Sequence, residues 1–282
     1  MSIVYLNGEF LPHDEAMISP EDRSFLFGDG LYEVVRVYNG RMFCGEDHLQ
    51  RMRYGGAELE LTIPFDDGEF QDIVEGLLRE NDLEEAMVYL QVSRGAQPRE
   101  HCFPEEYVPT VYANARPASR PSQDILENGV KAITHPDIRG GLCYIKTTAL
   151  LFNCLAASRA RRAGAFEALL VRQGFVTEAT ARSAFCVIDG KIFTHPLANI
   201  LPGITRKKVL ELARRHGWEF EERALPVNRF LEADEIFVTG TVSEAVPVVE
   251  VDGRRIGDGR PGPIFRRVSE ALEDYIEEVC GT

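Results

Sequence analysis

Lys146 is the residue whose surroundings in the sequence most suggest chemistry. It lies in GLCYIKTTALLFN (141–153), among apolar or small residues and several positions from any acid. A buried ammonium without a partner is costly, so such a lysine either gives up its proton or serves a purpose. A neutral, desolvated lysine is a nucleophile toward carbonyl groups, which is the Schiff-base role. The alternative is a lysine at a helix start whose stem is buried while its ammonium reaches water.

The other lysines have ordinary surface contexts, which makes Lys146 distinctive. The chain has only five lysines against twenty-six arginines. The remaining four lie beside polar residues, in an Asp-Gly-Lys turn, or in the first turn of an Arg-rich helix: Lys131, Lys191, Lys207 and Lys208.

An anion site is indicated by LPGITRKK (201–208), where Pro-Gly introduces a helix and Thr205 lies near the expected N-cap. The N–H groups of Gly203, Ile204 and Thr205 would point at an anion, and the helix dipole would favour its charge. A plain capped helix is the competing interpretation.

Two further segments supply donors suited to a phosphate. VTGTVSE (238–244) places Thr239 and Thr241 directly after an apolar strand, where ligand groups often bind. Arg51, in EDHLQRMRYGG, can grip a phosphate through two parallel hydrogen bonds. A polar turn and a solvated helix arginine are the alternatives.

Three more charged residues have the types and spacing to orient a substrate or cofactor. Glu178, in GFVTEATARSAF, follows a strand, and its carboxylate could hold a protonated ring nitrogen. Arg99 and His101 are two apart, so in an extended segment they point to one side and form a cationic trap for a carboxylate. The alternatives are a surface acid at a strand end and ordinary loop charges.

Composition excludes several classes of partner. The net charge of −14 argues against nucleic acid and anionic membranes, which both need clustered positive charge. No apolar run approaches the ~20 residues of a membrane span, and the start, MSIVYLNGEF, lacks the features of a signal peptide. The six cysteines include no CxxC pair and no His–Cys cluster with metal-ligand spacing, so we expect no metal site and a reducing cytoplasm.

Strand and helix patterns alternate throughout the chain. Hairpins are predicted around Asn7-Gly8 and Asn39-Gly40, and helices over 46–60 and 66–80. A helix is also predicted from about Thr147 or Thr148 through Arg162, stopping at Gly164. RPASRPSQ (116–123) has no periodicity and reads as a linker. We therefore expect a mixed α/β (α+β) chain with an N-terminal domain at 1–115, a linker at 116–123 and a C-terminal domain at 124–282.

Nearly end to end, the sequence resembles the fold-type IV pyridoxal-phosphate enzymes, the family of branched-chain and D-amino acid aminotransferases. The motifs that carry the resemblance occur in the family's order: RSFLFGDGLYEVVRVYNG, SRGAQPREHCFPE, DIRGGLCYIKT, VTEAT, GKIFTHP, LPGITR and VTGTVSE. Within the family the chain looks most like D-amino acid aminotransferases. Their Arg-x-His signature appears as Arg99-Glu100-His101, and their active-site tyrosine after Phe-Gly-Asp-Gly appears as Tyr32.

The resemblance implies roles for individual residues. Lys146 would form the Schiff base with pyridoxal 5'-phosphate, Glu178 would contact the pyridine nitrogen, and Leu201 would back the ring. Tyr32, Arg99 and His101 would trap the substrate carboxylate. The resemblance further implies a homodimer in which Arg99 and His101 reach the neighbouring subunit's site. It implies the following phosphate ligands: Arg51, Ile204, Thr205 and Thr241, with Gly203 beside them.

Two departures from the family pattern bear on orientation and specificity. Ser183 stands where the family usually carries asparagine, although Thr180 fits the same motif. Gly140-Gly141 replace bulkier side chains, which implies a wider pocket mouth.

The implied function is ping-pong transamination between D-amino acids, of the D-alanine or D-glutamate type, and 2-keto acids such as 2-oxoglutarate or pyruvate. A branched-chain L-aminotransferase and an aminodeoxychorismate lyase of the same fold are alternatives. A cofactor-binding carrier without turnover is a third. Arg99-Glu100-His101 argues against the first two, and a carrier has no need of a carboxylate trap.

Overall fold

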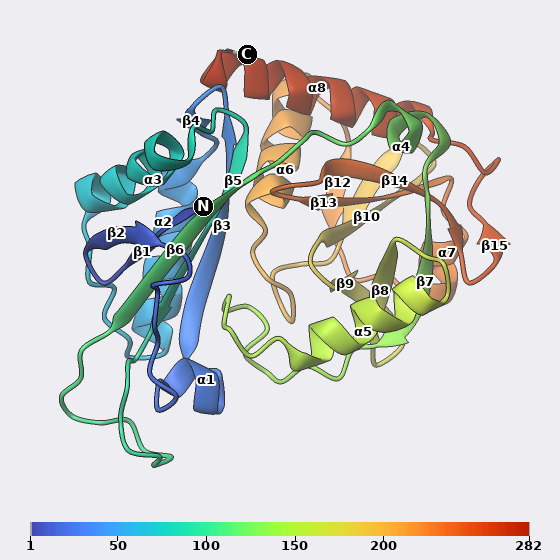
Figure 1. The fold of residues 1–282 in the computed structure, drawn as a ribbon. Coiled ribbons are helices and arrows are strands. Elements are labelled where there is room, and N and C mark those ends of the chain that lie inside the picture. The colour runs from blue at the N-terminus through green and yellow to red at the C-terminus, as the bar shows by residue number, and fades with distance from the viewer. Residues whose placement is uncertain (1, 282) are drawn as a thin grey trace. The chain divides into compact units, whose positions relative to one another are not determined.

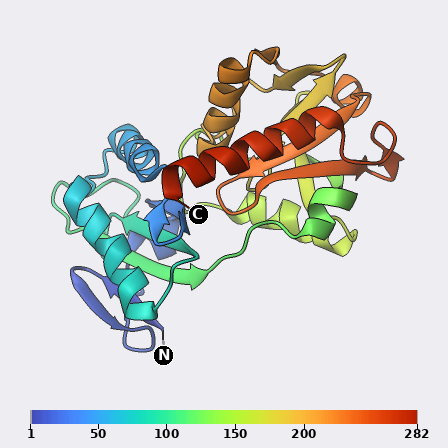
Figure 2. The ribbon, with the colours of Figure 1, turned by 90° about the horizontal axis from the view of Figure 1, so that it is seen from above.

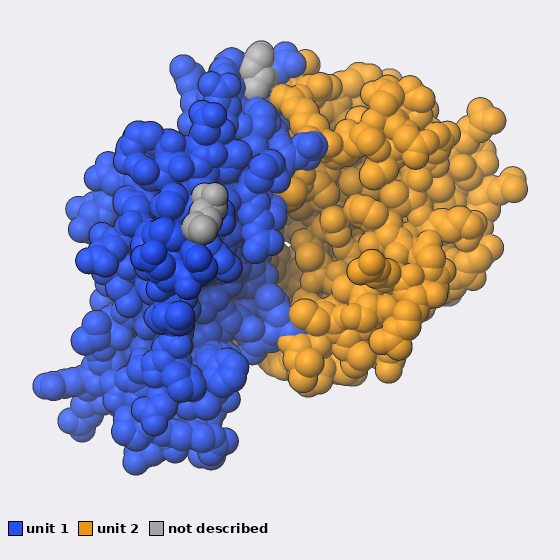
Figure 3. Space-filling model, in the orientation of Figure 1, with its two compact units in different colours: residues 1–119, 145–150, 276–282 blue, residues 120–144, 151–275 orange. Residues whose placement is uncertain are grey.

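The computed structural model describes residues 2–281, which form two compact units (Figure 3). Unit 1 comprises Met1–Ser119, Ile145–Leu150 and Ile276–Thr282, and unit 2 comprises Arg120–Tyr144 and Leu151–Tyr275. The expected domain limits stay a prediction. The compact units group residues 145–150, and therefore Lys146, with unit 1.

Unit 1 is built on a six-stranded antiparallel sheet with strand order β2-β1-β6-β5-β3-β4 (Figure 1). Its strands are β1 (Ile3–Leu6), β2 (Glu9–Pro12), β3 (Gly30–Tyr38), β4 (Arg41–Met42), β5 (Ala86–Ser93) and β6 (Thr110–Pro117). Its helices are α1 (Arg23–Phe27), α2 (Gly45–Glu58) and α3 (Asp67–Asn81). Both predicted hairpins and both predicted helices are therefore confirmed.

Alternation along β3, β5 and β6 buries one face of the unit 1 sheet. Val35, Val88 and Ala115 are direct cross-strand neighbours on that face. Removing this apolar surface from water is the main stabilising contribution of the layer. α3 begins with a capping box, in which Asp66 accepts from the Glu69 N–H and Glu69 accepts from the Asp66 N–H.

Unit 2 contains a nine-stranded mixed sheet with strand order β12-β11-β10-β13-β14-β7-β8-β9, and β15 pairs with β14. Its strands are β7 (Val130–Pro136), β8 (Glu167–Arg172), β9 (Phe175–Ala179), β10 (Ser183–Ile188), β11 (Lys191–Thr194), β12 (Phe220–Glu222), β13 (Glu235–Gly240), β14 (Glu244–Val251) and β15 (Arg254–Arg255). The remaining helices are α4 (Gln123–Asn128), α5 (Leu151–Arg162), α6 (Ile204–His216), α7 (Val227–Leu231) and α8 (Pro263–Cys280), the long red helix of Figure 2.

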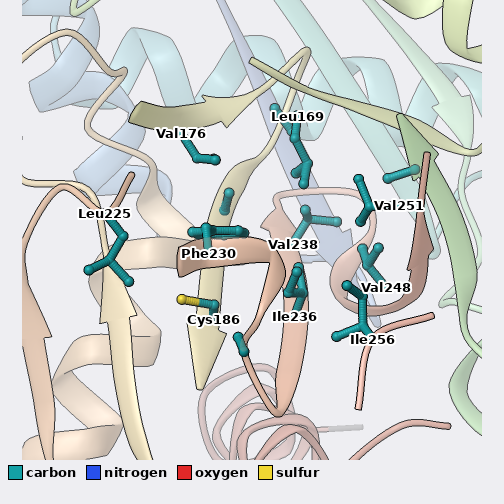
Figure 4. Close-up of a cluster of buried hydrophobic side chains, with 14 of the residues drawn as sticks. Leu169, Val176, Cys186, Leu225, Phe230, Ile236, Val238, Val248, Val251 and Ile256 are labelled. Carbon is teal, nitrogen blue, oxygen red and sulfur yellow. The ribbon is translucent and has the colours of Figure 1, made fainter. Parts of the chain in front are cut away.

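Both faces of the unit 2 sheet carry buried side chains, with Phe185 and Phe237 packed near Phe265 of α8 and a second cluster formed by the alternate residues. Ile236 and Val238 of β13 pack with Cys186 of β10, Val248 of β14 and Phe230 of α7 (Figure 4). A smaller cluster joins α5 to β8 through three alanines and one leucine: Ala156, Ala160, Ala168 and Leu170. This close packing gives a fixed frame for the polar residues at the strand ends.

The helix start predicted at Thr147 or Thr148 is wrong, because α5 begins only at Leu151. Residues 146–148 instead run beside the first residues of β3. Tyr32 N–H donates to Lys146 O at 3.0 Å, and Thr148 N–H donates to Gly30 O at 2.9 Å. These bonds pair the main-chain groups of Lys146 and Thr148 that intrahelical hydrogen bonds would otherwise pair. They also fix the backbone of Lys146 to β3.

Candidate active site

Within unit 1, Lys146 lies against Tyr32. Its Nζ is 4.1 Å from the centroid of the Tyr32 ring, and the Tyr32 ring stacks on Tyr89 with centroids 5.5 Å apart. Because the backbone of Lys146 pairs with that of Tyr32, the two side chains are held by the same piece of β3. Unit 1 therefore brings together two residues that the sequence placed more than a hundred positions apart.

Arg51, on α2, is held by a buried glutamate that the sequence reasoning missed. Its Nε donates to Glu33 Oε1 and its Nη2 to Glu33 Oε2, both at 2.7 Å. His48 Nδ1 lies 2.8 Å from Glu33 Oε2. The sequence did contain a signal for Glu33. It lies two positions from both Leu31 and Val35, so its side chain points to the same apolar face of β3 as theirs.

Electrostatics make this cluster a fixed ion pair. Burial alone would raise the pKa of Glu33, but Arg51 and His48 outweigh it and hold that pKa well below its usual range. Burial lowers the pKa of His48 although Glu33 opposes it, so the ring is neutral at neutral pH. An ionised carboxylate only accepts, and Nδ1 of His48 therefore carries the ring proton. The guanidinium of Arg51 is oriented by two hydrogen bonds to Glu33, whose carboxylate stays ionised across the physiological pH range.

Arg99 and His101 lie on the exposed loop between β5 and β6, and both side chains lie near the ring of Phe27. Arg99 Cζ is 5.1 Å from the ring centroid, and the imidazole centroid of His101 is 5.7 Å from it. Two exposed cation-forming side chains on one aromatic platform suit a carboxylate ligand.

Unit 2 holds the remaining predicted residues, beginning with Glu178 on β9. Glu178 is fully buried and accepts from Leu201 N–H, at 3.2 Å and 3.3 Å from its two oxygens. Arg139 Nη1 donates to Glu178 Oε1. Burial raises the pKa of Glu178 to about 7 against the opposing pull of Arg139. A protonated ring nitrogen beside this carboxylate would favour its ionised form.

Arg139 is a second residue that the sequence reasoning did not single out. Its Nε and Nη2 donate to the two oxygens of Asp137 at 2.9 Å and 2.8 Å, and Arg172 Nη2 also contacts Asp137 at 3.1 Å. Asp137 and Glu178 thus share one guanidinium, which is positioned from both sides. The signal was the spacing of Asp137 and Arg139, two positions apart at the end of a strand.

The start of α6 presents main-chain N–H groups that suit an anion. The N-cap is Gly203, and Thr205, expected near the N-cap, is the second helical residue. Glycine offers no side-chain acceptor, so none caps the first N–H groups of this thirteen-residue helix. Ser183, where the family pattern has asparagine, packs against this point: a Cβ built on Gly203 would lie 2.6 Å from Ser183 Oγ. A larger side chain at 203 would therefore displace Ser183.

An unsatisfied hydroxyl lies in the same part of unit 2. Thr239 is paired with Ser183 across β10 and β13, and its Oγ1 is buried without a hydrogen-bond partner among residues 2–281. Thr241 follows directly after β13 and is half-buried. Helix N–H groups and threonine hydroxyls together form the donor set that a phosphate group needs. The residues present therefore fit a phosphorylated cofactor.

Residues 30–251 match the family model described as amino-transferase class IV. The chain belongs to this family. D-alanine aminotransferase of Bacillus licheniformis is 39% identical over 274 residues, covering 97% of this chain and 96% of that protein. D-alanine aminotransferase of Staphylococcus haemolyticus is 40% identical over 279 residues, covering 98% and 99%.

Solved structures of this class IV fold agree with the architecture described above. The branched-chain amino acid aminotransferase of Escherichia coli superposes with a TM-score of 0.90 at 26% identity, covering 97% of this chain and 94% of that one. The T.th. branched-chain amino acid aminotransferase, solved with pyridoxamine 5'-phosphate, gives 0.90 at 28% identity, covering 99% and 94%. The expected mixed α/β fold of fold type IV is confirmed.

Proposed function

We propose that this class IV chain is a pyridoxal-phosphate-dependent aminotransferase that moves amino groups between D-amino acids and 2-keto acids. The observation that carries the substrate class is the pairing of Arg99 and His101 on the Phe27 ring, at an exposed site suited to a carboxylate. The two D-alanine aminotransferases, similar over nearly their full length, support the same class.

Pyridoxal phosphate, when bound, supplies an aldehyde that links to amines and a ring that takes up electron density from the substrate Cα. In this proposal Lys146 would hold the aldehyde until the substrate amine takes its place there, and the released Nζ amine would then carry the Cα proton. Glu178, oriented by Arg139, would face the ring nitrogen and favour its protonated form, and Leu201 would lie against the ring. The phosphate is bound by Arg51, by the N–H groups at Gly203, Ile204 and Thr205, and by the Thr241 hydroxyl.

Substrate selection is assigned to unit 1 residues. Tyr32, Arg99 and His101 hold the α-carboxylate, and its position decides which face of Cα meets Lys146. D-selectivity is then a difference in transition-state binding between the two enantiomers.

A homodimer is part of the proposal. Large apolar side chains of unit 1 are exposed in the single chain, including Phe25, Phe103 and Val108. Phe103 and Val108 lie on the same loop as Arg99 and His101, which is the loop expected to reach a second copy. For the location we propose the cytoplasm, since all six cysteines are free thiols and no described helix is long and apolar enough to cross a bilayer.

Lys146→Ala tests the covalent assignment. The variant is expected to bind the cofactor but to lose turnover by at least about 10²–10⁴-fold, because the residue that moves the proton is gone. Borohydride reduction of wild-type protein followed by peptide mapping should place the label on Lys146. Label on another lysine, or full activity in the variant, would refute the assignment; Lys208→Ala is the control.

The second candidate is a branched-chain L-aminotransferase, favoured by the fold similarity to the two branched-chain enzymes described above. D-alanine and L-leucine, fed separately with 2-oxoglutarate, distinguish the two functions. Transfer from D-alanine alone supports the proposal, and transfer from L-leucine alone overturns it. Pyruvate release from aminodeoxychorismate without any amino acceptor would instead indicate the lyase.

A further inference from the structure

Beneath the loop from 94 to 109 lies a buried cluster of two arginines on one aspartate. Arg23 Nε donates to Asp29 Oδ2 at 2.7 Å, and Arg94 Nε donates to the same oxygen at 2.9 Å. Arg94 also donates to the main-chain oxygens of Leu59 and Glu60, at 2.7 Å and 2.8 Å. Both guanidinium side chains are at most 3% exposed. Desolvating two cations this completely is costly, so the contacts they make in return must be numerous and well aligned.

Arg23 makes one contact that serves the loop directly. Its Nη1 donates to the main-chain oxygen of Glu100 at 2.6 Å. Glu100 is the residue between Arg99 and His101, and its own side chain is exposed. A part-buried, charge-assisted bond to the middle residue holds the backbone from which both flanking side chains project.

The same guanidinium also orders the platform on which the two side chains rest. Arg23 Cζ lies 4.8 Å from the Phe27 ring centroid, and the same ring contacts Arg99 and His101. The main-chain N–H of Arg23 further donates to Gly95 O at 2.9 Å, where the loop leaves β5. One residue thus contacts the loop's start, its central carbonyl and its aromatic support.

The loop's other end is held just as closely. Gly95 has φ +83°, and a Cβ there would lie 2.0 Å from Val108 O, so only glycine fits where the two ends of the loop meet. Between these ends, the bond from Arg23 holds the backbone at Glu100, and the centroid of the Phe103 ring lies 3.8 Å from Arg94 Cζ and 5.8 Å from Arg23 Cζ.

We propose that Arg23 is a positioning residue for the carboxylate trap, acting through the backbone of Glu100 and the ring of Phe27. The inference rests on the proposed function, since it assigns Arg23 to the residues that select the substrate. Arg23 itself need not touch the substrate. It fixes the separation and direction of Arg99 and His101, and misplacing such a group by about 1 Å can cost on the order of 10²-fold.

A double-mutant cycle on cofactor-loaded protein tests this role. The measured quantity is the dissociation constant for D-alanine in the half-reaction, from the saturation of the cofactor's absorbance change. Arg23→Met is expected to raise that constant about tenfold while the limiting rate stays within about twofold. Because Arg23 acts through both trap residues, Arg23→Met added to a variant that lacks both side chains, Arg99→Met with His101→Phe, should raise the constant no more than about twofold further.

Arg36→Met is the matched control. Arg36 is equally buried in unit 1, pairs with Glu85 and contacts two main-chain oxygens, none of them in the loop. It should leave the constant within about twofold even if it lowers stability. Arg23→Lys, which keeps the charge near Asp29, is the second variant if Arg23→Met fails to fold.

Hydrogen exchange of amides 96–106 gives a readout that is independent of turnover. Exchange should accelerate in both Arg23 variants and not in Arg36→Met. Additive effects in the cycle, or unchanged loop exchange, would overturn the inference. If wild-type protein does not react with D-alanine, the proposed function fails, and the exchange experiment still decides whether Arg23 holds the loop.

Discussion

In each unit a buried glutamate pairs with an arginine of the candidate site, Glu33 with Arg51 in unit 1 and Glu178 with Arg139 in unit 2, and these two carboxylates behave in opposite ways. In unit 1, Glu33 accepts two bonds from Arg51 and a third from His48, and its pKa lies below the usual range. In unit 2, Arg139 divides its donors between Glu178 and Asp137, and the pKa of Glu178 is raised to about 7.

The difference shows that burial with an arginine does not by itself fix a charge. What decides is how many donors the carboxylate receives and whether a second acid competes for them. Glu33 has the donors of a permanent anion that orients Arg51. Glu178 receives too few donors to be ionised at all pH values, so a nearby cation can change its protonation state. This property suits a carboxylate that faces a ring nitrogen.

The largest expected effect is on stability, from Glu33→Gln. The change leaves Arg51 buried without its anion, and the free energy of unfolding should fall by about 3–5 kcal/mol. Urea unfolding measures it. Glu85→Gln is the control, because Glu85 is half exposed and its partner Arg36 keeps two main-chain acceptors; its loss should stay below about 1 kcal/mol. Equal losses in both variants would contradict the comparison.

The second effect is a difference in pH dependence in cofactor-free protein. With a folded pKa near 7 against an ordinary 4.5, Glu178 holds its proton longer in the folded chain, so stability falls as pH rises from 4.5 to 7. The fall should reach roughly 3 kcal/mol. Glu33 acts in the opposite direction at lower pH, since its contribution is present above its ordinary pKa of 4.5 and is lost as pH decreases further.

Unfolding curves of wild-type protein and Glu178→Gln between pH 5 and 8 isolate this contribution. The variant lacks the titrating group, so its stability should be flatter over that interval. Parallel curves would show that Glu178 is ionised throughout, like Glu33.

The smallest expected effect comes from Arg139→Lys. A lysine keeps the charge but cannot serve Asp137 and Glu178 with one rigid fork, so the pKa of Glu178 should rise by about one unit. Carbon-13 NMR of labelled glutamate in cofactor-free protein follows that pKa. Arg172→Lys is the control, because Arg172 contacts Asp137 and the main-chain oxygen of Arg139 but makes no described hydrogen bond to Glu178. An equal shift of the Glu178 pKa in both variants would contradict the role assigned to Arg139.

Local patterns predicted much of the fold. The Asn-Gly pairs predicted two hairpins, apolar spacing located α2 and α3, and Pro-Gly marked the start of α6, because these signals lie within a few neighbouring residues. The start of α5 was misplaced since residues 146–148 pair with the start of β3, a long-range contact that no local pattern contains.

The site was predictable residue by residue only where the family resemblance supplied a motif. Lys146 drew attention because of its apolar surroundings, but its contact with Tyr32 depends on the tertiary fold. The supporting residues were missed for a common reason. Glu33, Arg139 and Arg23 are charged side chains whose importance comes from burial, and burial of a charge becomes visible only when its partners, distant in sequence, are known.

The closely joined ends of the loop at Gly95 and Val108 have a practical consequence for enzyme engineering. A segment whose two attachment points are fixed by backbone geometry can be exchanged as a cassette, with new lengths and sequences inserted between unchanged ends. Libraries that randomise residues 102–106 while retaining Arg94, Gly95, Arg99 and His101 should therefore vary donor preference without loss of the scaffold or of the carboxylate trap, whereas libraries that include position 95 should yield mostly misfolded protein.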